Sequence, residues 1–161
     1  TTDTYVMWDG FSPQGGAYSN NWVITPTTVS SDQPGTYYCW RNVPGFSQIG
    51  VYQGNANDNG TFVYCGFKPA FVWMIYSGPS SGDYQYIFDT TRNPYNPANE
   101  TLRWGNGQQY AEETNFGPIY FLSNGFKLGS SNFPNTGQPW AYAAFAENPL
   151  GGSNVSPVTA Q

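Results

Sequence analysis

Histidine is absent from this chain of 161 residues. Without His, a Ser-His-Asp or Cys-His catalytic arrangement cannot form, and neither can a zinc site that uses imidazole ligands. A Walker-type phosphate loop is also missing, because WGNGQQ lacks the Lys-Ser/Thr ending that would hold phosphate and magnesium. These absences exclude most hydrolase mechanisms and P-loop nucleotide chemistry. We expect no metal and no cofactor.

Charge is also scarce, at 9% of the residues, compared with about a quarter in ordinary domains. The 5 basic residues are scattered one at a time, and the net charge is −5. Nucleic acid requires a basic stripe that replaces its counterions, and an anionic membrane surface requires a similar cluster. No uninterrupted apolar segment approaches the length of a membrane span. We therefore expect neither nucleic acid nor a membrane as a partner.

Cysteine occurs twice, as Cys39 and Cys65, each inside an apolar run typical of a strand. The start of the chain, TTDTYVMWDG, has no signal-peptide pattern and indicates a cytoplasmic product that has lost its initiator Met. Without a secretory signal, two buried thiols acting as small hydrophobes are favoured over a disulfide, although a disulfide stays open.

Aromatic residues are abundant, with 11 Phe, 13 Tyr and 6 Trp, and turn formers accompany them. That much apolar area argues against disorder. Helical spacing is missing, and the best helical candidate is a single turn in NETLRWGNG, capped by Asn99 and ended by Gly105. Short β-branched and aromatic runs predict strands at Thr4–Trp8, Asn21–Thr25, Gly35–Arg41, Ser47–Gln53, Thr61–Phe67, Phe71–Ser77, Tyr84–Asp89, Gly117–Leu122, Gly125–Leu128 and Trp140–Ala146.

The stretch GTFVYCGFKPAFVWMIY at Gly60–Tyr76 indicates two strands joined at a corner near Gly66. The second strand is apolar on both faces, which predicts a central strand with Trp73 in the core. Asn57–Gly60 and Ser123–Gly125 carry hairpin signals.

The number and spacing of these strands predict an all-β fold, a two-sheet antiparallel β-sandwich of jelly-roll-like type. We expect residues 1–152 to form one domain, followed by a polar C-terminal tail at 153–161.

Glycoside hydrolysis survives the lack of His, because it requires only two suitably spaced carboxylates. Asp89 and Glu147 have a simpler interpretation as corner residues, with Asp89 accepting backbone N–H bonds and pairing with Arg92. The carboxylates available are Asp89, Glu100, Glu112, Glu113 and Glu147.

Two binding sites are also conceivable. Asn55, Asn57 and Asp58 could offer oxygen atoms to calcium, but their spacing is not that of an EF-hand, and a tight turn explains them more simply. Trp104 and Tyr110 are the best candidates for stacking on a carbohydrate. We assign no catalytic residue, and the ligand-binding residues stay unknown at this point.

The segments VYQGN, FVYCGFKPAFVWM, IFDTTRNPYN, IYFLSNGFKLG and WAYAAFAENP follow one another between Gly45 and Pro149. In order and spacing, this region resembles an uncharacterised domain family that recurs in bacteriophage virion proteins, notably tail and other structural proteins. Residues 1–44 carry no such resemblance. The family has no established catalytic residues to transfer.

The resemblance implies a non-enzymatic virion structural protein, made in the host cytoplasm. A small domain of this kind is similar to capsid decoration, cement or head-fibre proteins on the capsid surface. Its implied partners are the major capsid protein or other virion proteins, and its implied state is a homo-oligomer, with a trimer favoured. Two alternatives stay open: a tail-associated receptor- or glycan-binding module, and a glycoside hydrolase.

Overall fold

A computed structural model of the chain describes residues 40–76, 84–105, 108–114, 116–132 and 134–148, and the short strands β1 (Tyr5–Val6) and β2 (Val23–Ile24). Cys39 and the predicted tail at 153–161 lie outside the described residues. The remaining strands are β3 (Ser47–Gln53), β4 (Phe62–Tyr64), β5 (Pro69–Tyr76), β6 (Gln85–Asp89), β7 (Thr101–Gly105), β8 (Gln108–Glu113), β9 (Ile119–Leu122), β10 (Gly125–Leu128) and β11 (Pro139–Ala146). None of the described residues belongs to an α-helix. Within the same residues, no helix is long and apolar enough to cross a membrane.

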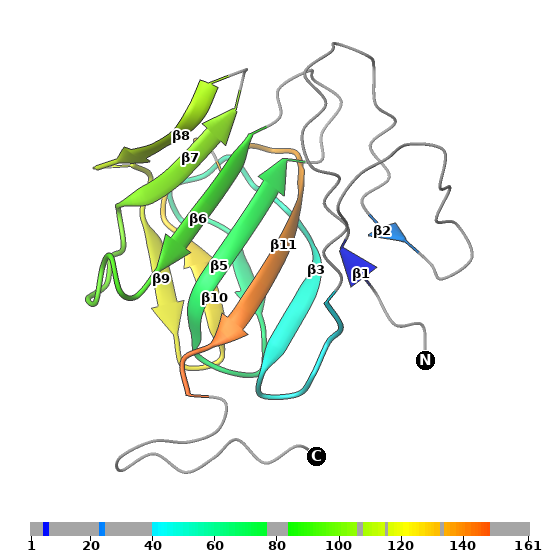
Figure 1. The fold of residues 1–161 in the computed structure, drawn as a ribbon. Helices are drawn as coiled ribbons and strands as arrows, with labels where there is room; N and C mark the ends of the chain where they lie inside the picture. The colour runs from blue at the N-terminus through cyan, green and yellow to red at the C-terminus, as the bar shows by residue number, and fades with distance from the viewer. Residues whose placement is uncertain are drawn as a thin grey trace.

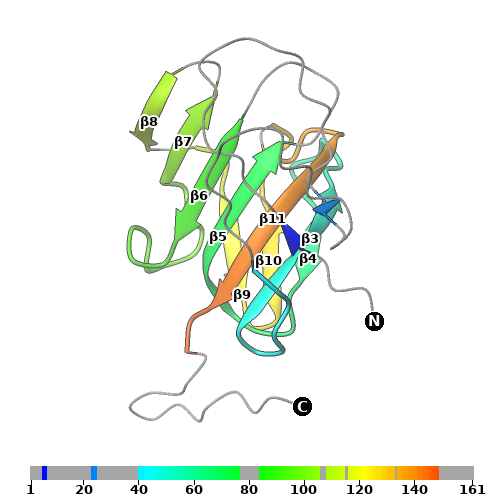
Figure 2. The same cartoon turned by 45° about the vertical axis from the view of Figure 1, so that its right-hand side comes forward.

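The strands form two stacked antiparallel sheets, one of six strands in the order β3-β11-β5-β6-β7-β8 and one of three in the order β4-β10-β9. Figures 1 and 2 show the three-stranded sheet behind the larger one, with β7 and β8 extending beyond β9. The predicted all-β, two-sheet antiparallel sandwich is therefore confirmed. β1 pairs with β2 in a separate small sheet.

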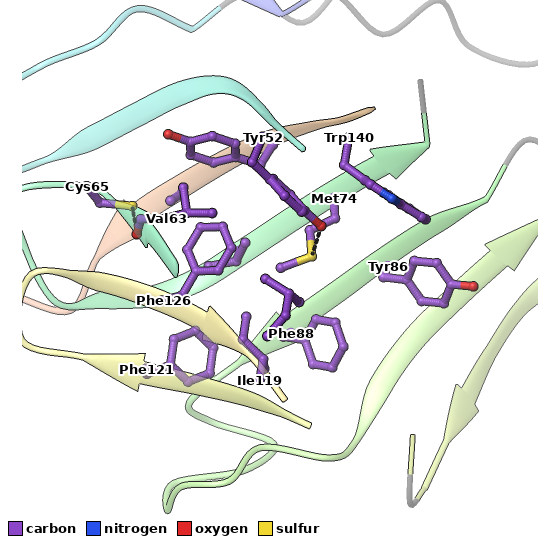
Figure 3. Packing of buried hydrophobic residues seen from close by; sticks show 14 of the residues in the cluster. Tyr52, Val63, Cys65, Met74, Tyr86, Phe88, Ile119, Phe121, Phe126 and Trp140 are labelled. Atoms are coloured by element: carbon purple, nitrogen blue, oxygen red, sulfur yellow. Dashed lines mark hydrogen bonds between the residues drawn. The ribbon is translucent and has the colours of Figure 1, made fainter. Parts of the chain in front are cut away.

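The main core lies between the two sheets, and aromatic side chains fill most of it (Figure 3). Trp140, Phe88 and Phe126 are each fully buried there. The phenol of Tyr52 is satisfied inside this core, because its hydroxyl donates to the carbonyl oxygen of Pro134 at 2.7 Å. The sandwich is thus held mainly by the burial of large apolar rings.

The corner predicted in Gly60–Tyr76 is confirmed. The chain leaves the three-stranded sheet at the end of β4 and enters the middle of the six-stranded sheet as β5. Gly66 lies between them with a φ of 78°, a backbone angle that residues with a Cβ rarely adopt. Phe62 and Tyr64 face outward, and Val63 and Cys65 face the core.

Trp73 packs against a second, smaller apolar cluster on the outer face of the six-stranded sheet. Its ring meets Trp40 edge to face, with ring centroids 5.9 Å apart. The indole N–H of Trp73 donates to Gln85 Oε1 at 3.2 Å. The central position of β5 is confirmed, but Trp73 does not lie in the main core: its side chain is half-buried and packs against the smaller cluster, because β5 presents it on the face away from the second sheet.

Two local predictions are wrong. Within NETLRWGNG, Thr101–Gly105 forms strand β7 instead of a helical turn, because its backbone pairs with β6 on one side and with β8 on the other. Asn57–Gly60 does not close a hairpin, since the strands on either side of it, β3 and β4, belong to different sheets. By contrast, Ser123–Gly125 does join paired strands, β9 and β10.

The strand predicted at Gly35–Arg41 lies mostly outside the described residues. Trp40 and Arg41 are described, and neither is in a strand. The chain turns back at this point, because the Arg41 carbonyl oxygen accepts the Ser47 hydroxyl at 2.7 Å and Asn42 Oδ1 accepts the Ile49 N–H at 2.6 Å.

Candidate functional site

Four of the five carboxylates considered for glycoside hydrolysis, Asp89, Glu112, Glu113 and Glu147, form ion pairs. Asp89 Oδ1 accepts the Arg92 backbone N–H at 2.7 Å, and Asp89 Oδ2 lies 2.9 Å from Arg92 Nη2. This confirms that Asp89 caps its corner and pairs with Arg92. Glu112 contacts the other terminal nitrogen of the same guanidinium at 3.2 Å, so a cation bridges these two carboxylates.

The other carboxylates lie elsewhere. Glu147 pairs with Lys68 at 2.8 Å, and Glu113 pairs with Arg103 at 2.8 Å. The backbone N–H of Glu100 donates to Asn93 Oδ1 at 2.7 Å. The structure therefore distributes the candidate acids over separate contacts along the six-stranded sheet and its connections.

The oxygen atoms proposed for calcium are used inside the β3–β4 connection. Asn55 Oδ1 accepts the Asn57 N–H at 3.1 Å, and Asn57 Oδ1 accepts the Asn59 N–H at 2.8 Å. Asp58 Oδ1 accepts the Ser131 N–H at 2.8 Å. Hydrogen bonds from the Ser131 side chain and, to a smaller extent, from its backbone lower the pKa of the Asp58 carboxyl. Turn formation accounts for Asn55 and Asn57, whereas Asp58 joins this connection to the β10–β11 connection.

The outer face of the three-stranded sheet carries a group of apolar side chains, which we call the aromatic face. Phe62 and Tyr64 are 44% and 66% exposed. Strand alternation places their neighbours on the same side, because the residues between them point into the core. The aromatic face consists of the apolar side chains of Phe62, Tyr64, Tyr120 and Leu122, together with the charged side chain of Lys127.

The register of the sheet arranges these side chains in two rows. Lys127 on the central strand lies between Phe62 and Tyr120, and Gly125 lies between Tyr64 and Leu122. The Lys127 ammonium donates to Asn59 Oδ1 at 2.5 Å, which holds the charge toward the β3–β4 connection. The result is a broad apolar surface with one tethered cation.

A second feature is an open cleft of about 470 Å³ where the six-stranded sheet extends past β9, which we call the edge cleft. The sheet contributes Tyr86 from β6 and Arg103 from β7, which are register partners. The β8–β9 connection contributes Phe116, Gly117 and Pro118, and the β10–β11 connection contributes Ser130 and Asn132.

Local contacts hold these groups in place. The rings of Tyr86 and Phe116 stack with centroids 4.9 Å apart. Figure 3 shows the Tyr86 hydroxyl pointing away from the other labelled core side chains. The guanidinium carbon of Arg103 lies 5.8 Å from the centroid of the Tyr84 ring, and the guanidinium pairs with Glu113. The Phe116 N–H donates to the Asn99 carbonyl oxygen at 2.8 Å, which fixes the β8–β9 connection.

Two pKa shifts describe the electrostatics of the cleft. Burial raises the pKa of Tyr86, so that its phenol stays neutral at physiological pH. Burial alone would lower the pKa of Arg103, but its hydrogen bond to Glu113 and the nearby tyrosines raise it. The cleft therefore presents a neutral hydroxyl beside a permanently charged but paired guanidinium.

Comparison with known families gives one match. Residues 2–149 match a domain of unknown function (DUF7483). The chain belongs to this family. No curated protein and no solved structure matches the chain.

The DUF7483 match contains every residue of the aromatic face and of the edge cleft. It begins at residue 2, and so includes most of the leading segment 1–44 that the sequence resemblance left unmatched. Both surfaces therefore belong to the family domain.

Few residues of the aromatic face and the edge cleft were predicted from the sequence. The side chains of Trp104 and Tyr110, predicted to stack on carbohydrate, lie outside what the structure describes. Strand alternation separates Phe62 and Tyr64 from Val63 and Cys65, but the packing of the two sheets decides that Phe62 and Tyr64 are the exposed pair. Phe116, Ser130 and Asn132 carried no local signal, because they come from two separate connections that meet in the folded chain.

Proposed function

We propose that this chain is a non-enzymatic structural protein of a bacteriophage virion, which binds the capsid surface as a decoration, cement or head-fibre protein. The virion setting rests on the sequence resemblance. The observation that supports a binding role is the aromatic face, where Phe62 and Tyr64 are 44% and 66% exposed on adjacent positions of one sheet. The partner proposed for this face is the major capsid protein, with other virion proteins as the wider class.

The chemistry of the aromatic face suits a protein partner. Exposed Tyr and Phe rings supply large contact areas at a low cost in side-chain entropy, and such residues are enriched in protein–protein interfaces. The Lys127 ammonium already donates to Asn59, so part of its hydrogen-bonding requirement is met when a partner covers this face. A regular sheet also presents these side chains on a rigid support.

A homotrimer is part of the same proposal. A symmetric oligomer can bind several repeated subunits of the capsid at once, so that weak individual contacts give a tighter overall association. Sedimentation or light scattering of the free protein measures the oligomeric state. A monomer at all working concentrations would remove this part of the proposal and leave the docking face to be tested separately.

The deciding experiment locates the protein. Labelled protein is mixed with undecorated capsids in one tube and with host cells in another, and both are pelleted. We expect saturable binding to capsids, with a copy number per shell that follows capsid symmetry. Binding to cells alone would overturn the capsid role and favour the tail-associated receptor-binding alternative.

Matched variants connect this result to the aromatic face. Tyr64→Ser and Phe62→Ser remove exposed rings and are expected to weaken capsid binding about tenfold or more, as for interface hot spots. Val51→Ser is the control, because Val51 is 51% exposed but lies on β3 in the other sheet. Equal binding by all three variants would show that another surface docks on the capsid.

A further inference from the structure

We propose that the edge cleft is a binding site for a neutral sugar ring, in which Phe116 contacts the apolar side of the ring and Asn132, Ser130 and Tyr86 contact its hydroxyl groups. The inference is independent of the capsid role, because the residues of the cleft and those of the aromatic face do not overlap.

The size of the cleft fits a small ligand. Its volume of about 470 Å³ lies within the range of roughly 300–1,000 Å³ typical of small-molecule sites. The cleft is preformed, because Phe116 stacks on the buried Tyr86 and the Phe116 N–H is hydrogen-bonded to Asn99. A preformed site spends little binding energy on ordering its own side chains.

Charge favours an uncharged ligand over an anion. Arg103 is the one basic residue in the lining of the cleft, and Glu113 already lies 2.8 Å from its Nη1. The pair has no net charge, and the chain as a whole carries −5. A phosphate or carboxylate would therefore have to compete with Glu113 for the guanidinium. The free edges of a paired Arg and Glu can still hydrogen-bond to neutral hydroxyl groups.

The polar groups of the cleft supply both donors and acceptors, which a polyhydroxylated ring requires. The Tyr86 phenol is neutral, and its oxygen accepts in the side-chain hydrogen bond with Arg103, because a guanidinium can only donate. Ser130 Oγ accepts the Asn132 N–H at 3.1 Å, and this bond leaves the Ser130 hydroxyl hydrogen available as a donor. The exposed Asn132 side chain adds an amide with both functions.

The apolar side of the ligand has a partner as well. Phe116 and Pro118 are half-buried, and both line the cleft. Tyr86 covers one face of the Phe116 ring, so the rest of that ring is presented to the cleft from a fixed position. A sugar ring has C–H groups on one side and hydroxyl groups around its rim, which matches an apolar wall opposite polar side chains.

The test is an NMR titration of the full chain with defined probes. Methyl glucoside, methyl galactoside and methyl N-acetylglucosaminide, in both anomeric forms, are each added to isotope-labelled protein up to about 50 mM, so that a dissociation constant in the millimolar range is detected. Inorganic phosphate is the anionic probe. We expect saturable shifts at the backbone amides of Phe116, Gly117, Ser130 and Asn132 with at least one glycoside.

Two variants and one control make the site specific. Asn132→Ala and Phe116→Leu are expected to weaken glycoside binding about fivefold or more, and Phe116→Leu keeps the apolar contact with Tyr86. Asn124→Ala is the matched control. Asn124 is an exposed Asn in the β9–β10 turn, at the end of β9 and β10 that lies opposite the edge cleft.

Three results would overturn the inference: no saturable shift with any glycoside, saturable shifts that map outside the cleft, or binding of phosphate in preference to every glycoside. Capsid binding in the pelleting experiment is unaffected by any of them, so the two proposals fail separately.

Discussion

Asn55 and Asn135 hold each other through a reciprocal pair of hydrogen bonds. The Asn55 N–H donates to Asn135 Oδ1 at 3.2 Å, and Asn135 Nδ2 donates to Asn55 Oδ1 at 2.7 Å. The same Nδ2 also lies 2.9 Å from the carbonyl oxygen of Asn57 and 2.7 Å from that of Ser130. Asn135 is fully buried, so one side-chain amide fastens the β3–β4 connection to the β10–β11 connection.

Replacement of Asn135 by Ala should therefore destabilise the protein. Acceptors on Asn55, Asn57 and Ser130 lose their shared donor at once, which is expected to lower the free energy of unfolding by about 2–4 kcal/mol and the Tm by about 5–15 °C. Differential scanning calorimetry measures both. Asn132→Ala, three residues earlier and exposed, should stay within about 0.5 kcal/mol of the parent. A parent-like Tm for Asn135→Ala would contradict the role of this amide.

A methyl group on Gly125 should be more damaging than one on Gly137. A Cβ at Gly125 collides with the backbone carbonyl oxygen of Val63 on the paired strand β4, whereas a Cβ at Gly137 meets the Ala56 Cβ at 3.9 Å, an ordinary contact. Gly125→Ala is expected to lower the free energy of unfolding by about 1–3 kcal/mol. Gly137→Ala is expected to leave the free energy of unfolding unchanged or to raise it slightly. The two variants are compared by urea unfolding, monitored by far-UV circular dichroism. Equal urea concentrations at the unfolding midpoint would refute the prediction.

The thiol of Cys65 should be inert in the folded protein. Cys65 is a free cysteine, 6% exposed, and burial raises its pKa to about 12. Because the thiolate is the reactive form, a thiol reagent at about pH 8 should modify Cys65 only after unfolding. Mass spectrometry of a peptide that contains Cys65 follows the reaction with and without urea. Rapid modification of the native protein would show that this thiol reaches solvent.

Stability should fall in alkaline solution. Burial raises the pKa of Tyr52 and of Tyr142, as it does for Cys65 and Tyr86. The unfolded chain then releases these protons first, beginning near pH 8.5 for Cys and near pH 10 for Tyr. The stabilisation is therefore complete below those values and decreases as the pH rises, by about 1.4 kcal/mol per pH unit for each group that is ionised only in the unfolded chain.

Urea unfolding at several values between about pH 7 and pH 11 tests this dependence. The Cys65→Ala variant removes one titrating group, so its stability should decrease less steeply between about pH 9 and pH 11 than that of the parent. A free energy of unfolding that does not change over this interval would mean that these side chains are accessible to solvent in the fold.

The strands themselves were largely predictable. Ser47–Gln53 and Gly125–Leu128 begin and end in the structure at the residues that the sequence pattern indicates. Alternation also separated Phe62 and Tyr64 from Val63 and Cys65, without deciding which pair faces outward, and local backbone chemistry placed a corner at Gly66. These features depend on side-chain polarity with a period of two and on the freedom of one glycine, and both are properties of short segments.

The errors occurred where pairing between strands decides the structure. Thr101–Gly105 is a strand because β6 and β8 lie on either side of it, although its own residues also fit a helical turn. Asn57–Gly60 has the composition of a hairpin turn, but β3 pairs instead with β11, so that Ser47 lies opposite Phe145. Backbone hydrogen bonds to distant strands outweigh such local preferences.

By itself, the sequence determined an all-β chain rich in aromatic core residues, poor in charge, and without the histidine that many catalytic and metal sites require. The tertiary structure alone decided which rings are buried, that Glu112 joins Asp89 at Arg92, that Glu113 pairs with Arg103, and how the connections after β8 and β10 meet at Tyr86 to form the edge cleft. The physical reason is that composition and periodicity act along the chain, whereas a site is formed by residues that only the pairing of distant strands brings together.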